Sequence, residues 1–412
     1  MTAWIGWLAM QVVSGFLAQD LGTLARSLEP GDSPRMVVEL GGEAALVYAR
    51  PERGSATGRL RVGTVPGVFE RVRGPGCAED WLRIGRDAWI CGTGRTVREG
   101  VPQAERWPPP PGRWAPLPFL YVHPLGRGRM IYDTPLAAVD GVYGRPFRPA
   151  TWECVVASFG RQGTPLYRTA SGAYLRQDDV RLAAPSALAG VFPGPESAPW
   201  PYAFVAADDA DVFVEPPPRS RQVPAVLAGR LPRYAMVRVE EEGERWVRVG
   251  EGQYLRRDEV RRFRPHERPD GVGPGERWFD VDLTEQVFSV WDGDVPHFVT
   301  LASTGKGGTT HEGSFRIWRA AAVQTMTGLP TDDGGREYDV RDVPWVLFFD
   351  EDRAIHAAFW HDDFGNARSH GCVNLSPVAA RWVFDMARPS LPDGWMAIDP
   401  PAETSTLVYV HR

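Results

Sequence analysis

The feature that most constrains the fold is a pattern that occurs three times in roughly the first two thirds of the chain. Each copy begins with an aromatic residue three positions before a proline, in the stretches "VYARP", "IYDTP" and "VFVEP". A second signature follows 30, 31 and 30 residues after that proline, in "WLRIGRDAWIC", "LYRTASGAYLR" and "WVRVGEGQYLR". Every copy of the signature has an arginine at its third position and an aromatic residue at its ninth. This regular spacing predicts one structural unit repeated in tandem.

Each repeated unit is predicted to be a small β-barrel. Short β-branched and aromatic runs alternate with Gly, Pro and Asp turns, and "RWVRVGEGQYLRRDEV" predicts a hairpin that turns between Gly250 and Gly252. The units resemble bacterial SH3-like domains over roughly residues 35–265. Proline-rich joints separate them, which predicts units at 31–106, 117–190 and 200–264. Their aromatic residues are either core or a platform that holds a polymer substrate for the last domain.

Composition excludes some classes of partner. The 412 residues are 43% hydrophobic and 24% charged, which is typical of a soluble globular protein. The net charge is −6 and the basic residues are dispersed, so we expect no nucleic-acid partner. Residues 1–30 contain an apolar run that predicts either an export leader or a packed N-terminal helix. We expect no membrane span, because no apolar run is long and clean enough.

The four cysteines are too few for a scaffold built from disulfides. Cys77 and Cys91 lie in one predicted unit, where they either form a single bridge in an oxidising compartment or remain two buried thiols. Cys154 has no evident partner.

After residue 275 the sequence predicts a second kind of β-rich domain. "RWFDVDLTEQVFSVWDGDVPHFVTLAST" predicts a β-meander with a turn at 292–294, and "PWVLFFD" at 344–350 predicts a buried central strand. Ser376 is a helix cap and Pro377 suits the first turn. "VAARWVFDMA" supplies an apolar face from Val378, Trp382, Val383 and Met386.

Between that strand and that helix, "HAAFWHDDFGNARSHGCVNL" at 356–375 contains three of the eight histidines and one of the four cysteines. Three interpretations compete: packed core residues, a zinc site, or a cysteine nucleophile with a histidine base. The spacing H-x4-H-x8-H-x-C matches no regular zinc finger, so we expect no metal. A thiol just before a helix N-terminus gains from the helix dipole, and a nearby imidazole can take its proton. The sequence therefore favours a nucleophile whose thiolate form is stabilised.

The stretch "SHGCVN", with a histidine sixteen residues before the cysteine, resembles the signature of the L,D-transpeptidase catalytic domain, the YkuD family. The resemblance covers about residues 275–412. "RWFDVDLTEQVFSVWDG" is similar to the opening hairpin of that domain and "STLVYV" to its closing strand. "STGKGGTTHEGSFRIW" is similar to a segment that usually reads T-P-x-G, although His311 stands where a proline is normal.

The resemblance implies a β-sandwich with one or two helices and assigns roles to the residues of the stretch. Cys372 would be the nucleophile and His356 its general base, with His370 orienting or lying on the oxyanion side. The backbone N–H groups of Gly371 and Cys372 would bind the oxyanion. The other candidates are substrate-binding residues: Ser369, Asn374 (where many relatives have arginine), His361, Trp360 and Met326. For His361, a surface position without a role in binding is an equally open alternative. For Trp360 and Met326, the equally open alternative is packing in the core.

The implied activity is acyl transfer in the bacterial cell wall. The acyl donor would be a peptidoglycan stem tetrapeptide, and carbapenem-type inhibitors could acylate the same thiol. No cofactor is expected, and the protein is expected in the cell envelope. The acceptor amine stays open, and two alternatives remain: an L,D-carboxypeptidase that uses water, or a non-catalytic protein that binds the wall. A papain-type cysteine peptidase is disfavoured, because its cysteine precedes its histidine in the chain.

Overall fold

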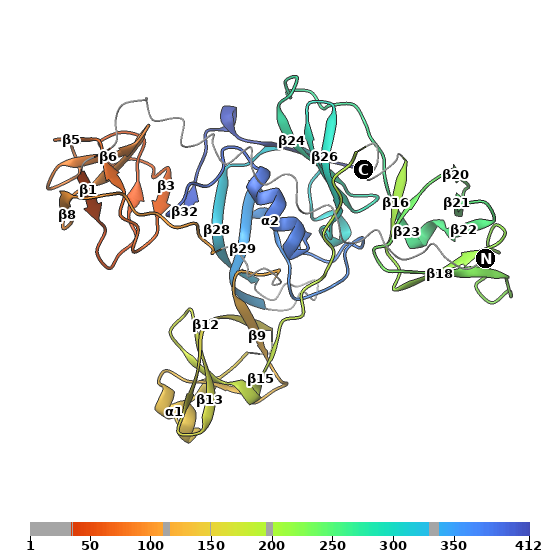
Figure 1. Ribbon diagram of the computed structural model, residues 1–412, viewed down its shortest axis with the longest axis horizontal. Helices are drawn as coiled ribbons and strands as arrows, with labels where there is room; N and C mark the ends of the chain where they lie inside the picture. Colours follow the sequence, from red (N-terminus) through yellow and green to blue (C-terminus); the bar gives the residue numbers. More distant parts are fainter. Residues whose placement is uncertain (1–33, 35, 110–115, 149, 195–200, 329–337) are drawn as a thin grey trace. The chain divides into compact units, whose positions relative to one another are not determined.

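The computed structural model describes residues 34, 36–109, 116–148, 150–194, 201–328 and 338–412. The predicted leader or helix at 1–30 lies outside these residues. The chain divides into two compact units, Met1–Arg106 with Pro392–Trp395, and Trp107–Leu391 with Met396–Arg412 (Figure 1). The described part is mainly β, as predicted, with two α-helices.

The first unit consists of short strands around a small core. Val38, Val47, Leu60, Leu82 and Ile90 are almost completely buried in it. Cys77 and Cys91 form a disulfide, so the bridged alternative is the one the structure adopts. The strands are β1 (Met36–Glu39), β2 (Leu46–Val47), β3 (Gly58–Leu60), β4 (Gly67–Val68), β5 (Glu70–Val72), β6 (Trp81–Gly85), β7 (Ala88–Cys91) and β8 (Thr96–Glu99).

The second unit begins with two further groups of short strands. The first group contains β9 (Leu120–Pro124), β10 (Met130–Ile131), helix α1 (Pro135–Asp140), β11 (Arg145–Pro146), β12 (Thr151–Arg161), β13 (Thr164–Thr169), β14 (Tyr174–Arg176) and β15 (Val180–Leu182). The second contains β16 (Tyr202–Val205), β17 (Asp209–Phe213), β18 (Leu227–Pro232), β19 (Met236–Arg238), β20 (Glu241–Glu242), β21 (Trp246–Gly250), β22 (Gln253–Arg256) and β23 (Val260–Phe263).

The repeated signature corresponds to a repeated strand pairing. In each copy the ninth-position aromatic pairs with the aromatic residue before the proline, in Tyr48–Trp89, Tyr132–Tyr174 and Phe213–Tyr254. The same aromatic also pairs with the arginine of its own hairpin, in Arg83–Trp89, Arg168–Tyr174 and Arg248–Tyr254. The described residues contain no closed barrel, so the SH3-like character and the domain boundaries stay predictions.

The C-terminal part is built on two sheets. One has the order β26-β25-β24-β33-β27 and starts with the predicted meander, which turns at Gly293. Its strands are β24 (Arg277–Asp282), β25 (Val287–Asp292), β26 (Val295–Leu301), β27 (Gly313–Arg316) and β33 (Leu407–His411). The other sheet contains β28 (Arg319–Gly328), β29 (Tyr338–Asp350), β30 (Arg353–Ala357), β31 (Val373–Leu375) and β32 (Trp395–Ile398). The predicted central strand lies within β29.

The predicted helix is α2 (Pro377–Met386). The Ser376 hydroxyl accepts a hydrogen bond from Ala379 N–H, and Pro377 occupies the first turn, as the sequence indicates. The buried residues of α2 are Pro377, Ala379, Ala380, Val383 and Phe384. Of the predicted apolar face only Val383 is buried, and Trp382 is exposed.

Both strand groups of the second unit pack against the C-terminal sheets. β12 pairs in parallel with β29, which places Trp152 beside Val340. Tyr121, Trp152, Val343 and Phe359 lie in one apolar cluster. A second cluster joins Tyr202, Phe204 and Phe263 to Trp278 and Trp291 of the meander. These contacts bring β9, β12, β16 and β23 close to the histidine-rich stretch.

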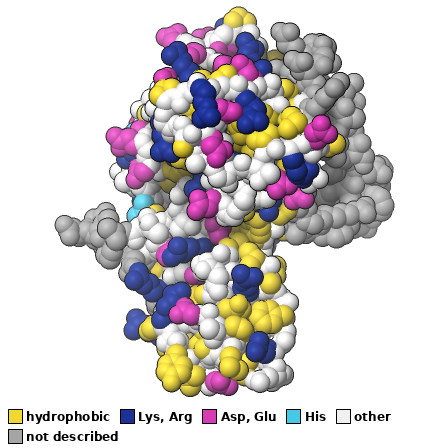
Figure 2. All heavy atoms as spheres, turned by 90° about the vertical axis from the view of Figure 1, so that its left-hand side faces the viewer, with side chains coloured by type: hydrophobic (Ala, Val, Ile, Leu, Met, Phe, Trp, Pro, Cys, Tyr) yellow, Lys and Arg dark blue, Asp and Glu magenta, His cyan; other side chains and the backbone are white. Residues whose placement is uncertain are grey.

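On the face seen in Figure 2, basic and acidic side chains are interspersed, with no extended region of one sign. Of the helices in the described residues, none combines the length and the apolarity that a membrane crossing requires.

Candidate active site

A parallel strand pair positions the two predicted reacting residues. β30 carries His356 and β31 begins directly after Cys372, with Ile355 paired to Val373 and His356 to Asn374. Continuing this register by one residue places Cys372 beside Ala354. Side chains two positions apart on a strand share a face, so Cys372, His356 and Asn374 lie on the same side of the pair. The fold thus brings residues sixteen positions apart onto one small surface.

The His356 ring is buried and one of its nitrogens faces a backbone carbonyl. It is 2% exposed, and its Nδ1 atom lies 3.1 Å from the carbonyl oxygen of Ala357. A carbonyl can only accept, so Nδ1 carries the hydrogen and Nε2 keeps a free lone pair. Burial lowers the pKa of His356 to about 4, although the bond to Ala357 O works in the opposite direction. At neutral pH the ring is therefore uncharged and able to accept a proton at Nε2.

Burial disfavours the thiolate form of Cys372 in this structure, contrary to the sequence-based expectation that this form is stabilised. Burial raises the pKa of its thiol to about 11, and a backbone hydrogen bond from Ala354 offsets only part of that effect. The prediction that a helix dipole stabilises the thiolate is wrong, because β31 separates Cys372 from α2, whose N-cap is Ser376. The dipole effect fades within the first turn.

The turn before Cys372 is fixed by hydrogen bonds around Gly371. The Ser369 hydroxyl donates to Cys372 O at 2.5 Å and accepts from Gly371 N–H at 3.1 Å. Thr310 Oγ1 donates to Gly371 O at 2.8 Å. Gly371 has φ = +144°, and a β-carbon there would lie 3.1 Å from Thr309 O. Ser369 therefore shapes the turn, and glycine is required at position 371.

One predicted role changes as a result. The Gly371 N–H already binds Ser369 Oγ, so it is not available to an oxyanion. The Cys372 N–H donates to no loop or side-chain acceptor among the described residues, and it remains as the candidate donor. The hydrogen bond from Thr310 could not be predicted from the spacing of residues within the motif, because Thr310 lies 61 residues before Gly371. That spacing also does not show that the Ser369 hydroxyl makes two hydrogen bonds.

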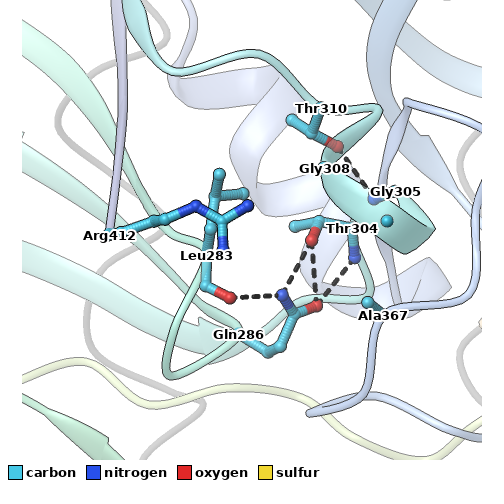
Figure 3. Close-up of a pocket in the computed structure, with 9 residues that line it drawn as sticks. Leu283, Gln286, Thr304, Gly305, Gly308, Thr310, Ala367 and Arg412 are labelled. Carbon is cyan, nitrogen blue, oxygen red and sulfur yellow. Dashed lines mark hydrogen bonds between the residues drawn. The ribbon is translucent and has the colours of Figure 1, made fainter.

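The segment resembling T-P-x-G packs against this turn. Ser303 pairs with Asn374 and Gly305 with Ser369. A cavity of about 210 Å³ opens beside it, lined by Leu283, Gln286, Thr304, Gly305, Gly307, Gly308, Thr310, Ala367 and Arg412 (Figure 3). His311, which replaces the usual proline, lies 3.0 Å from the Asp350 carboxylate and 3.1 Å from Arg353.

Residues 276–410 match the family model of YkuD, the L,D-transpeptidase catalytic domain. This match includes Cys372 and all three histidines of the stretch. We refer to the matched region as the YkuD-type domain. No match was found among curated proteins.

Solved structures of L,D-transpeptidases resemble part of the chain. An Enterococcus faecium enzyme is 22% identical, over 34% of this chain and 50% of that chain, with a TM-score of 0.26. A Mycobacterium smegmatis enzyme is 20% identical over 42% and 82%, with a TM-score of 0.26. L,D-transpeptidase 3 of Mycobacterium tuberculosis, solved with a faropenem-derived adduct, is 19% identical over 39% and 73%, with a TM-score of 0.27. The chain thus spans half the length of the Enterococcus structure.

His361 contacts Asn374 in the YkuD-type domain. Its Nε2 atom lies 3.1 Å from the Asn374 amide, and its Nδ1 atom accepts from Asp363 N–H at 3.3 Å. The Asn374 atom that faces His361 Nε2 is Nδ2, and Asn374 Oδ1 is buried without a hydrogen-bond partner among the described residues. Burial is the main cause that lowers the pKa of His361 to about 4. The His361 side chain is therefore uncharged and partly buried, and it is not a fully solvent-exposed surface residue.

The remaining predicted residues of the YkuD-type domain lie around the strand pair. Trp360 stacks on the His356 ring at 5.7 Å. Met326 and Trp360 pack, with Cys372, against the cluster that contains Phe359 and Tyr121. His370 is exposed and stacks on Tyr338 at 5.5 Å. The structure brings Met326, Trp360 and Cys372 to one cluster, and it places His370 at the rim.

One group of potential metal ligands occurs among the described residues, away from the motif. His266, Asp280 and His411 have ligand atoms within 4.8 Å of one another. Both Nε2 atoms lie close to the same carboxylate oxygen of Asp280, at 2.8 Å and 3.0 Å. Zinc-bound ligand atoms lie roughly 3.3 Å apart, from bonds of about 2.0 Å and tetrahedral angles. Shared contact with one oxygen is instead the geometry of an ionic hydrogen-bond network.

Proposed function

We propose that the YkuD-type domain is a peptidoglycan L,D-transpeptidase in which Cys372 carries the acyl group. The observation that carries the proposal is the family match over residues 276–410. It is supported by His356, whose unprotonated Nε2 shares a strand face with Cys372. The donor would be a stem tetrapeptide that ends in D-alanine.

In the first half-reaction the thioester forms and D-alanine leaves. His356 Nε2 takes the Cys372 proton as the sulfur attacks the carbonyl carbon at the L-centre of diaminopimelate. The Cys372 N–H binds the oxyanion that develops on the carbonyl oxygen. When the tetrahedral intermediate collapses, the amide C–N bond breaks and the His356 imidazolium protonates the departing amine of D-alanine. The products are free D-alanine and an acyl thioester on Cys372.

Proton transfer is coupled to attack in this scheme. A thiol pKa of about 11 and an imidazole pKa of about 4 make the isolated transfer from Cys372 to His356 unfavourable. Electrostatic attraction between the resulting thiolate and imidazolium offsets part of the unfavourable free energy of this proton transfer. The neutral pair is consequently the ground state, and ionisation accompanies contact with the substrate.

In the second half-reaction an acceptor amine attacks the thioester carbon and loses its proton to His356. The C–S bond then breaks, and the imidazolium returns the proton to the Cys372 sulfur. An acceptor amine on a second stem would give a cross-link. Water in place of the amine would give an L,D-carboxypeptidase, so exclusion of water decides between the two outcomes.

Substrate recognition is proposed for the residues around the strand pair. Trp360 and Met326 would form an apolar wall for the acyl donor, since both pack with Cys372. Asn374 and His361 would present polar atoms on the same side, and His370 would contact substrate from the rim. Residues 117–190 contribute Tyr121 and Trp152 to the cluster beneath this wall.

An extracytoplasmic location is part of the proposal. Peptidoglycan lies outside the cytoplasm, and the Cys77–Cys91 disulfide is of a kind that persists in oxidising compartments. The repeated units, predicted as SH3-like, would then lie near glycan. A protein that only binds the wall is the alternative from another class.

Release of D-alanine from a stem tetrapeptide tests the proposal directly. Cys372→Ala should abolish release and leave the thermal unfolding temperature nearly unchanged, because a thiol and a methyl group are similar in size. Cys154→Ala is the matched control, since Cys154 is the other free cysteine and is buried beside Tyr121. It should retain release. Release by the Cys372 variant would refute the assignment.

Acylation by a carbapenem separates the enzyme from a silent wall-binding protein. Intact-mass analysis should show one adduct on the unaltered protein and on the Cys154 variant, and none on the Cys372 variant. A protein that binds muropeptides without any adduct would support the non-catalytic alternative. Free tripeptide as the only product, with an amine present, would identify a carboxypeptidase.

A further inference from the structure

Side chains from residues 200–264 hold the loop that leads from β30 to the cysteine motif. We call residues 361–368 the pre-motif loop. The Tyr234 hydroxyl donates to Asp362 Oδ1 at 2.7 Å and accepts from Phe364 N–H at 3.3 Å. Arg233 adds a bond from its guanidinium to Asp362 O. One aromatic residue outside the YkuD-type domain thus fixes two neighbouring points of the loop.

Arg261 holds the next part of the pre-motif loop. Its Nε atom donates to Gly365 O at 2.5 Å and its Nη2 atom to Asn366 Oδ1 at 2.9 Å. Gly365 has φ = +91°, and a β-carbon there would lie 3.0 Å from the Ala206 side chain. The glycine allows the loop to approach residues 200–264 closely enough for these bonds to form.

The opposite side of the loop is attached to the catalytic domain. Ser303 Oγ donates to Asn366 O at 2.6 Å, and Asn366 Nδ2 donates to Asp363 Oδ1 at 2.7 Å. Asp363 N–H then donates to His361 Nδ1, and His361 Nε2 contacts Asn374. Phe364, at the centre of the loop, is completely buried in the cluster that contains Tyr202 and Phe204.

We propose that Tyr234 and Arg261 are positioning residues that hold the pre-motif loop and, through it, the His361–Asn374 contact. This inference rests on the proposed function, because that contact lies on the same strand face as Cys372 and His356. Residues 200–264 are then part of the catalytic apparatus and not only a wall-binding attachment. A loop without regular secondary structure samples many conformations unless other parts of the protein constrain it, and these bonds supply the constraint.

The test compares four full-length variants. Tyr234→Phe removes only the hydroxyl. Arg261→Ala removes both donors to the loop, together with the Nη1 bonds to Asp258 O and Val260 O within its own segment. Arg261→Lys keeps the charge but not the forked guanidinium. Arg230→Ala is the matched control, since Arg230 lies on the same segment but, among the described residues, forms its ion pair with Asp211 and none with the loop. Hydrogen exchange of peptides covering 361–368, carbapenem acylation of Cys372 and alkylation of Cys372 by iodoacetamide are measured on each.

Arg261→Ala should speed exchange of the pre-motif loop by about ten- to a hundredfold, the equivalent of losing a charged hydrogen bond. Tyr234→Phe should speed it by about three- to tenfold. Carbapenem acylation should slow in the same order, whereas iodoacetamide, a small reagent that needs no oriented site, should react at an unchanged rate. Arg261→Lys should recover part of both losses, and Arg230→Ala should match the unaltered protein.

Unchanged exchange in Arg261→Ala, or faster exchange with unchanged acylation, would overturn the positioning role. An equal loss in Arg230→Ala would also overturn it, because the effect would then be general to the segment. Exchange needs no activity: if the unaltered protein is neither acylated nor able to release D-alanine, the proposed function fails, while exchange still decides whether these residues hold the loop.

Discussion

A neutral Cys372–His356 pair predicts that two reactions at the same sulfur depend differently on pH. With a thiol pKa of about 11, roughly one molecule in ten thousand holds a thiolate at pH 7, and the fraction rises tenfold with each pH unit. Alkylation by iodoacetamide, which consumes thiolate, should rise in the same way from pH 6 to pH 9. Carbapenem acylation should instead be nearly flat over this range, because His356, with a pKa of about 4, is already an unprotonated base.

The two rates are measured by intact mass on the unaltered protein and on His356→Gln, with Cys154→Ala present in both to remove the second thiol. In the His356 variant, acylation should fall by about a hundred- to ten-thousandfold, the usual contribution of a general base. Its alkylation should change little. A midpoint of alkylation between pH 5 and pH 7 in the unaltered protein would refute the reasoning, since it would reveal a preformed thiolate.

Three further perturbations follow from contacts in the YkuD-type domain. Gly371→Ala should cost about 1–3 kcal/mol of unfolding free energy and most of the acylation rate, because φ = +144° and Thr309 O oppose a β-carbon; an unaltered melting temperature and rate would contradict this. Ser369→Ala should slow acylation by about tenfold through loss of both turn bonds, and a rate equal to that of the unaltered protein would be inconsistent with it. Asp280→Asn should lower the free energy of unfolding of the protein most strongly near pH 5–6. Burial disfavours charge on His266 and His411, yet the Asp280 carboxylate raises the pKa of both, while they lower its own. The contribution of this network to the free energy of unfolding is therefore complete between an unfolded aspartate pKa of about 3.9 and an unfolded histidine pKa of about 6.5. In denaturant titrations, the difference in unfolding free energy between the unaltered protein and Asp280→Asn should narrow as pH rises through the raised pKa values of the two histidines.

Much of the local structure was accessible to sequence reasoning because it depends on nearby residues. The meander turning at Gly293, the strand at 344–350 and the helix capped by Ser376 each follow from periodicity and turn chemistry over short stretches. The repeated signature predicted a repeated hairpin, and the structure shows the same pairing at Trp89, Tyr174 and Tyr254.

The errors concern features that short sequence patterns do not encode. β31 is only Val373–Leu375, too short to separate from the following helix by pattern, so Cys372 was expected beside a dipole that does not reach it. The raised thiol pKa reflects burial by residues from several elements, which no spacing within 356–375 encodes. The Ser369 hydroxyl occupies the Gly371 N–H that was expected to bind an oxyanion. Tyr234 and Arg261 lie about a hundred residues or more from the loop they hold.

The most direct measurement for the central claim is the mass of the protein during turnover of a defined stem tetrapeptide without an acceptor amine. We expect an adduct equal to the tripeptide acyl group on Cys372, with one D-alanine released for each adduct formed. Addition of an amine should discharge the adduct into an amide product. D-alanine release without an adduct on that sulfur, or an adduct that survives Cys372→Ala, would contradict the account.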